Sequence, residues 1–79
     1  MKMTKAEFRK TKEYADAVNK IKKQRVGFKF TIPYHKMSKG LKNAMDVVTS
    51  DCVREGIIES ISIGVNLAGE WTEETFKRI

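Results

Sequence analysis

The side chains with the most reactive chemistry in this sequence are few and widely spaced. His35 and Cys52 are the single histidine and the single cysteine, 17 residues apart. Because a zinc site needs three or four such ligands at short, regular spacing, no metal site is predicted. Ser38 follows His35 closely, but no acid stands at a spacing that would orient the imidazole for nucleophilic catalysis. The sequence therefore predicts a protein that is not an enzyme and holds no cofactor.

The segment HKMSKG, from His35 to Gly40, is where cations meet a predicted helix start. Lys36 and Lys39 flank Ser38, a residue type that commonly caps helices. Backbone N–H groups at a helix start can hold an anion, although the segment lacks the GxxxxGK[ST] spacing of a nucleotide phosphate loop. We expect either an ordinary helix cap or a site for one anion.

Positive charge is concentrated toward the N-terminus. Residues 1–30 carry ten Lys or Arg against three acids, and residues 51–79 have a net charge of −3, within a total of +6. This asymmetry favours an anionic partner, such as nucleic acid, an acidic protein surface or anionic lipid. The candidate nucleic-acid-binding residues are Lys5, Arg9, Lys12, Lys20, Lys23, Arg25, Lys29, Lys36 and Lys39.

Length and composition set the class of protein. A chain of 79 residues with 41% hydrophobic content predicts one small folded domain over residues 1–79. The lone cysteine excludes an internal disulfide and is typical of a reducing, cytoplasmic compartment. No apolar run approaches 18 residues, so no membrane span is expected. The N-terminal residues MKMTKAEFRK lack the apolar segment of a signal peptide.

The segment 25–34, RVGFKFTIPY, predicts the central strand. Apolar residues at its even positions, Val26 to Tyr34, alternate with polar or small residues, which is the period of a strand with one buried face. The second predicted strand covers 57–67, with Ile61, Ile63, Val65 and Leu67 on its buried face. Ile58, Ser60, Ser62, Gly64 and Asn66 are predicted on the polar face.

Three helices are predicted around these strands. Thr4 and Glu7 have the spacing of a capping box for a helix from residue 4 to about 24. Ser38 caps a second helix, which Gly56 ends because glycine adopts a left-handed conformation without strain. Thr72 with two following glutamates predicts a short helix over 72–79. A strand is less favoured there, since it would place Trp71 and Phe76 on opposite faces.

The predicted fold is α+β, an α/β two-layer sandwich with the order α-β-α-β-α. Its two strands are expected to run parallel through a helical crossover, with both long helices on one face of a small sheet. The expected buried residues are Phe8, Tyr14, Val18, Ile21, Val26, Phe28, Phe30, Ile32, Leu41, Met45, Val48, Cys52, Ile61, Ile63, Val65 and Leu67. The edges of so small a sheet favour a homodimer.

Two functions remain open at this stage. The first is a small basic protein that binds DNA or RNA largely independently of sequence, through the cations named above. The alternative is a protein-binding module or small inhibitor that docks on an acidic protein through its sheet edge or its open sheet face. That open face is expected to present Arg25, Lys29 and Thr31 beside the polar residues of the second strand. The sign of the net charge favours the first.

Overall fold

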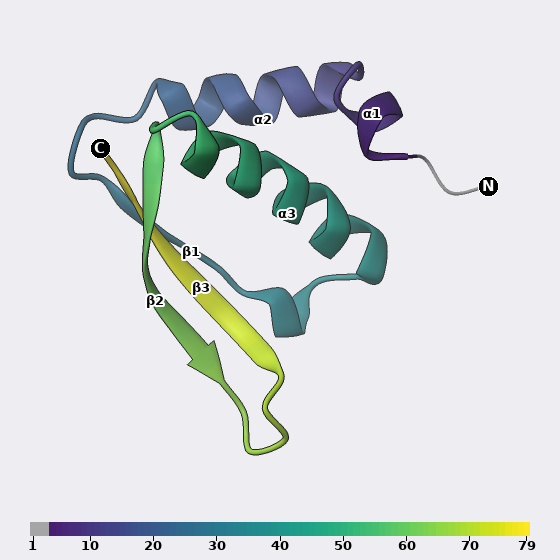
Figure 1. Cartoon of the computed structure of the whole chain (residues 1–79), viewed down its shortest axis with the longest axis vertical. Helices are drawn as coiled ribbons and strands as arrows, with labels where there is room; N and C mark the ends of the chain where they lie inside the picture. Colours follow the sequence, from purple (N-terminus) through teal and green to yellow (C-terminus); the bar gives the residue numbers. More distant parts are fainter. Residues whose placement is uncertain (1–3) are drawn as a thin grey trace.

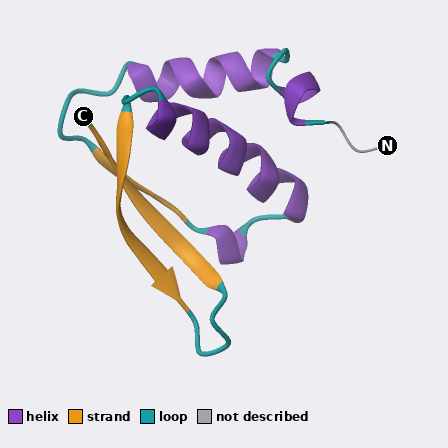
Figure 2. Ribbon diagram, in the orientation of Figure 1, coloured by secondary structure: helices purple, strands orange, loops and turns teal. Residues whose placement is uncertain are grey.

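The structure, a computed structural model, describes residues 4–79. Its elements are α1 (Lys5–Phe8), α2 (Lys12–Lys22), β1 (Lys29–Ile32), the 3-10 turn η1 (Tyr34–Lys36), α3 (Lys39–Arg54), β2 (Ile58–Val65) and β3 (Trp71–Arg78) (Figures 1 and 2). The mixed α+β class is as predicted. The predicted order α-β-α-β-α is not, because the N-terminal helix is divided in two and the chain ends in a strand.

Over the described residues the sheet has three strands in the order β1-β3-β2, and both pairings are antiparallel. β1 and β2 therefore run in the same direction on either side of β3, so that the helical connection through α3 links two parallel strands that do not touch. The helix predicted over 72–79 is wrong. As a strand, this segment forms backbone hydrogen bonds with both neighbouring strands, whereas a short helix would leave the facing edges of β1 and β2 without a partner.

Local capping explains where the helices begin and end. Thr4 accepts a hydrogen bond from the Glu7 N–H at 3.1 Å, and Ser38 accepts one from the Leu41 N–H at 3.2 Å, so both predicted caps are confirmed. The predicted single helix over residues 4–24 is interrupted at Thr11. The Thr11 hydroxyl accepts from the Tyr14 N–H at 3.2 Å and donates to the Phe8 carbonyl at 2.7 Å, which ends α1 and starts α2.

β1 is shorter than predicted, although its phase is correct. Ile32 is buried and Phe30 is half-buried, as the even positions should be. Val26 and Phe28 are exposed, contrary to the prediction, because the chain turns before β1 begins. The Phe28 N–H donates to the Arg25 carbonyl at 3.1 Å within this turn.

β2 contains an extra residue that reverses its phase. Ser60 pairs with Phe76 and Ser62 pairs with the adjacent Thr75, so Ile61 between them is a β-bulge. Ser62 lies on the polar side of the sheet as predicted. Ile58 and Ser60, predicted on that polar side, instead face the helices, because the predicted alternation holds only after the bulge.

A second irregularity changes the phase of β3. Glu73 pairs with Gly64 and Trp71 pairs with Val65, which leaves Thr72 as the extra residue. The bulge places Trp71 on the same side of the sheet as Phe76, five residues away, which strict alternation would forbid. The sequence argued against a strand here because strict alternation would place Trp71 and Phe76 on opposite faces. The bulge removes that argument.

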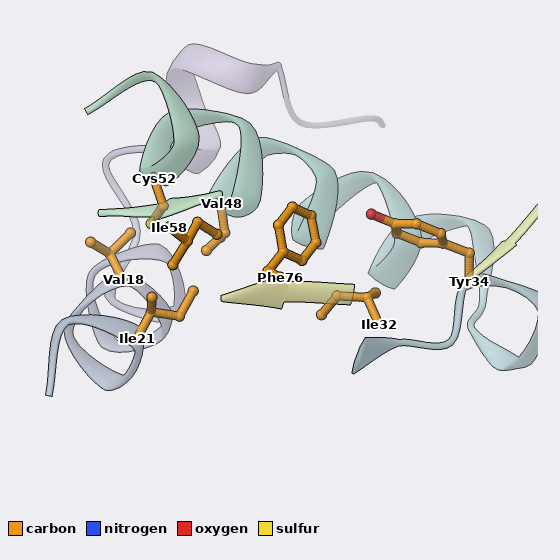
Figure 3. Packing of buried hydrophobic residues seen from close by; sticks show 8 residues of the cluster. All are labelled: Val18, Ile21, Ile32, Tyr34, Val48, Cys52, Ile58 and Phe76. Atoms are coloured by element: carbon orange, nitrogen blue, oxygen red, sulfur yellow. The ribbon is translucent and has the colours of Figure 1, made fainter. Parts of the chain in front are cut away.

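The core joins α2 and α3 to one side of the sheet, called here the helix side. Val18 and Ile21 of α2 lie near Ile58, while Val48 and Cys52 of α3 point toward the same residue (Figure 3). The cluster is completed by Ile32, Tyr34 and Phe76. Cys52 is fully buried, as predicted for a small core residue, and burial raises the pKa of its thiol.

The outer half of the β2–β3 hairpin extends beyond the helices (Figure 1). Five residues predicted to be buried are exposed: Leu41, Ile61, Ile63, Val65 and Leu67. Leu41 lies in the first turn of α3, and the other four belong to the β2–β3 hairpin. The side of the sheet opposite the helices, called here the open side, is polar. Thr31 and Thr75 lie there with their hydroxyl oxygens 2.9 Å apart.

Candidate nucleic-acid interface

The last turn of α2 supplies the first group of cations at the candidate interface. Lys20 and Lys22 lie in this turn, and Lys23 is the C-cap residue. All three side chains are exposed. Cations at this position stabilise the negative end of the helix dipole, so their placement requires no acidic partner.

The turn between α2 and β1 holds the next cation against the end of β3. Gly27 has a φ of +93°, which favours glycine, and its N–H donates to the Arg78 carbonyl at 2.7 Å. In return the Arg78 N–H donates to the Phe28 carbonyl at 2.8 Å. These two bonds hold the turn between α2 and β1 beside the C-terminal end of β3 (Figure 1). The exposed Arg25 belongs to this turn, two residues before Gly27.

Two further lysines meet on the open side of the sheet. Lys29 of β1 is directly opposite Lys77 of β3. Like charges in such a pair are unfavourable by roughly 0.2–1 kcal/mol. Glu59 of β2 is opposite Lys77 on its other flank and offsets part of this repulsion. An anion bound near Lys29, which lies on the edge strand, would offset the rest.

These six residues are called the basic corner: Lys20, Lys22, Lys23, Arg25, Lys29 and Lys77. The hydrogen bond from the Gly27 N–H to the Arg78 carbonyl joins the turn after α2 to the end of β3 (Figure 1). Four members were predicted from the sequence. Lys22 was missed although it shares their segment, and Lys77 was missed because its position depends on the third strand.

The remaining candidate cations lie elsewhere. Lys36 and Lys39 belong to η1 and the start of α3, at the far end of the molecule from the end of α2 (Figure 1). Lys5 and Lys39 line a hollow of about 740 Å³ between α1 and α3. Lys12 is exposed at the start of α2. The nine candidate nucleic-acid-binding residues therefore lie on several separate surfaces.

Arg9 is held in an ion pair. Its Nε and Nη2 donate to the two carboxylate oxygens of Asp51 at 2.8 and 2.9 Å. Arg54 donates to the same carboxylate at 3.0 Å and the Tyr14 hydroxyl does so at 2.6 Å. The hydrogen bonds from Arg9 lower the pKa of Asp51 from 3.8 to about 2. The hydrogen bond to Asp51 raises the pKa of Tyr14 to about 12.

Within residues 4–79, Asp51 is the acid of both ion pairs in the structure, one with Arg9 and one with Arg54. Among the described residues, therefore, no carboxylate forms an ion pair with the basic corner. The open side of the sheet differs from the prediction in this respect. It carries Glu59 and Glu73 as well as Lys29 and Lys77, so it is mixed in charge.

The described residues contain neither a candidate metal-ion site nor a helix that could span a membrane. Among the described residues, no three His, Cys, Asp or Glu side chains gather where they could hold a metal ion. No helix in the same part of the chain has the length and apolar character of a membrane span. Comparison of the chain with protein-family models, curated proteins and solved structures finds no match.

Proposed function

We propose that the protein binds nucleic acid through the basic corner, without enzymatic activity and largely independently of sequence. The observation that carries this proposal is the gathering of six cations at one end of the molecule, three at the end of α2, one in the following turn and two on the open side of the sheet. Within residues 4–79 none of the six forms an ion pair. A cytoplasmic location, consistent with the reduced, buried Cys52, is part of the proposal.

The physical basis is the neutralisation of backbone phosphates. Lysine and arginine side chains displace counterions condensed on a polynucleotide, and the released ions supply most of the free energy of such binding. Phosphate contacts carry no base information, so DNA and RNA of different sequence should bind with similar affinity. The corner is built from two strand ends, a helix end and a turn, so its cations are displayed from a fixed backbone.

The test compares two charge reversals of equal size. Arg25→Glu with Lys29→Glu alters the basic corner, and Lys36→Glu with Lys39→Glu alters the opposite end of the molecule. All four positions are exposed, and glutamate at the first residue of α3 suits the helix dipole, so both variants should fold. Binding to labelled duplex and single-stranded oligonucleotides is measured at about 50 mM salt.

The corner variant should lose binding by at least tenfold, while the control variant should lose much less. Equal losses would mean that net charge matters and the corner does not. If the parent protein binds neither DNA nor RNA under these conditions, the proposed function is wrong. An acidic protein partner would then be the better explanation of the basic corner.

A further inference from the structure

The outer edge of β2 differs from the rest of the surface. β2 has eight residues, and within residues 4–79 only its inner edge is paired, because β2 ends the strand order β1-β3-β2. Natural edge strands usually avoid pairing through lysine, proline, shortness or a bulge. β2 has no lysine or proline, and Glu59 is its one charged residue. Its bulge lies at Ile61, so residues 62–65 beyond it form a regular edge.

The apolar residues of the strand are concentrated in its outer half. Ile61, Ile63 and Val65 are 43%, 44% and 55% exposed. Ile63 and Val65 face the helix side of the sheet, and their exposure shows that the helices do not cover them. A long unpaired backbone edge and a row of uncovered apolar side chains therefore coincide on one strand.

We propose that this edge pairs with the same edge of a second copy, forming an antiparallel β2–β2 ladder and a continuous six-stranded sheet. In a twofold arrangement centred on Ile63, each Ile63 faces its mate. Ile61 of each copy then faces Val65 of the other, and Ser62 faces Gly64. Every apolar residue of the row thus meets another, which makes the edge complementary to itself.

Charge permits a second copy as the occupant. Residues 60–66, which form the centre of the proposed ladder, contain no charged residue, so the directly opposed pairs bring no like charges together. The basic corners of the two copies stay away from this contact. In the register centred on Ile63, the two Glu59 residues lie at opposite ends of the ladder. At roughly 3.3 Å per residue they are beyond the screening length of physiological salt.

The first test measures mass in solution. Light scattering after size exclusion should give twice the chain mass of 9.1 kDa for the parent protein. Ile63→Lys should halve this mass. The control Val53→Lys makes the same change at an equally exposed apolar residue of α3 and should leave the dimer intact. A parent protein that stays at 9.1 kDa throughout the micromolar range would overturn the proposal.

The second test does not depend on weakening the fold. Directly opposed residues of an antiparallel ladder have Cα atoms roughly 4.5–5.5 Å apart, within the range of a disulfide. Ile63→Cys should therefore cross-link two chains on mild oxidation, whereas Val53→Cys should not. The natural Cys52 is fully buried and does not compete. Equal cross-linking of both variants would show that random collision, and not the β2 ladder, brings the cysteines together.

Discussion

Asp51 connects the N-terminal helices to α3. Arg9 follows α1 and Tyr14 lies in α2, and both donate hydrogen bonds to this one carboxylate. The Asp51 side chain is 4% exposed, while the Arg9 and Arg54 side chains are 38% and 70% exposed. The arginine charges therefore remain partly hydrated, and Arg9 is less available to a polyanion than the lysines of the basic corner.

Asp51→Asn should lower the free energy of unfolding by about 1–3 kcal/mol, the usual cost of losing hydrogen bonds to a charged group. The cost should stay below that of stranding a fully buried cation, since both arginines can regain water. Urea melts at neutral pH measure the change. The exposed Asp46 of α3 provides the control, because Asp46→Asn should alter stability by a few tenths of a kcal/mol. Equal effects of the two substitutions would contradict this role of Asp51.

The lowered pKa of Asp51 also predicts an acid transition. The folded state keeps Asp51 ionised down to about pH 2, whereas the ordinary value is 3.8. Between these values the unfolded chain binds more protons, so stability present at higher pH is lost as the pH falls toward 2. The melting temperature should fall less between pH 5 and pH 2 in Asp51→Asn than in the parent. Parallel curves would assign the acid sensitivity to other groups.

At the level of the elements, the bulge in β2 determines which of its serines bonds to a buried carboxylate. The Ser60 hydroxyl donates to Glu74 at 2.6 Å, and the Tyr34 hydroxyl donates to the same carboxylate at 3.0 Å. Glu74 is 9% exposed, so losing a donor leaves a buried charge less satisfied. Ser60→Ala should cost about 1–3 kcal/mol in a urea melt. Ser62→Ala on the open side should cost almost nothing. A larger loss of stability in Ser62→Ala than in Ser60→Ala would contradict a bulge at Ile61.

The same bulge predicts unequal roles for two isoleucines of β2. Ile58 is 1% exposed and packs in the core, so Ile58→Ala should cost about 2–5 kcal/mol through lost burial and cavity formation. In the monomer, Ile63→Ala should cost less than about 1 kcal/mol, because its side chain is still largely hydrated. Denaturant melts at a concentration too low for association measure both. A larger loss of stability in Ile63→Ala than in Ile58→Ala would instead support the strict alternation predicted from the sequence, in which Ile63 is buried and Ile58 is not.

Local signals in the sequence predicted part of these elements. The caps at Thr4 and Ser38 and the stop at Gly56 depend on neighbouring residues, and the structure has all three. The bulge at Ile61 and the strand β3 depend on pairing between segments far apart in the chain. At Thr72 the local capping pattern favoured a helix, and the tertiary pairing with two strands outweighed it.

At the scale of the whole molecule, charge is segregated along the chain and in space. Residues 17–45 contain eight Lys or Arg and no acid, and residues 55–76 contain five glutamates and no Lys or Arg. The sequence therefore predicted which stretch is basic. It could not show that Lys29 meets Lys77 while Lys36 lies far from both, since that grouping follows from β3 entering the sheet between β1 and β2.

The two proposals are compatible because they use different surfaces. Pairing through β2 leaves β1 at the outer edge of each half of the extended sheet, with its basic corner exposed. A dimer would therefore present two copies of the corner, and a polynucleotide long enough to reach both would bind more tightly through the linkage. The monomeric Ile63→Lys variant should consequently retain binding to short oligonucleotides and lose affinity for long ones.

The salt dependence of binding tests the central claim, phosphate binding by the basic corner, most directly. Affinity for a labelled duplex is measured by fluorescence anisotropy at increasing salt for the parent, for Arg25→Gln with Lys29→Gln, and for Lys36→Gln with Lys39→Gln. The parent should show a steep negative slope of log K against log[salt]. The corner variant should flatten it by about two units, one for each phosphate contact removed, and the control variant should keep the parent slope. Equal slopes for all three proteins, or a parent that does not bind, would contradict the account.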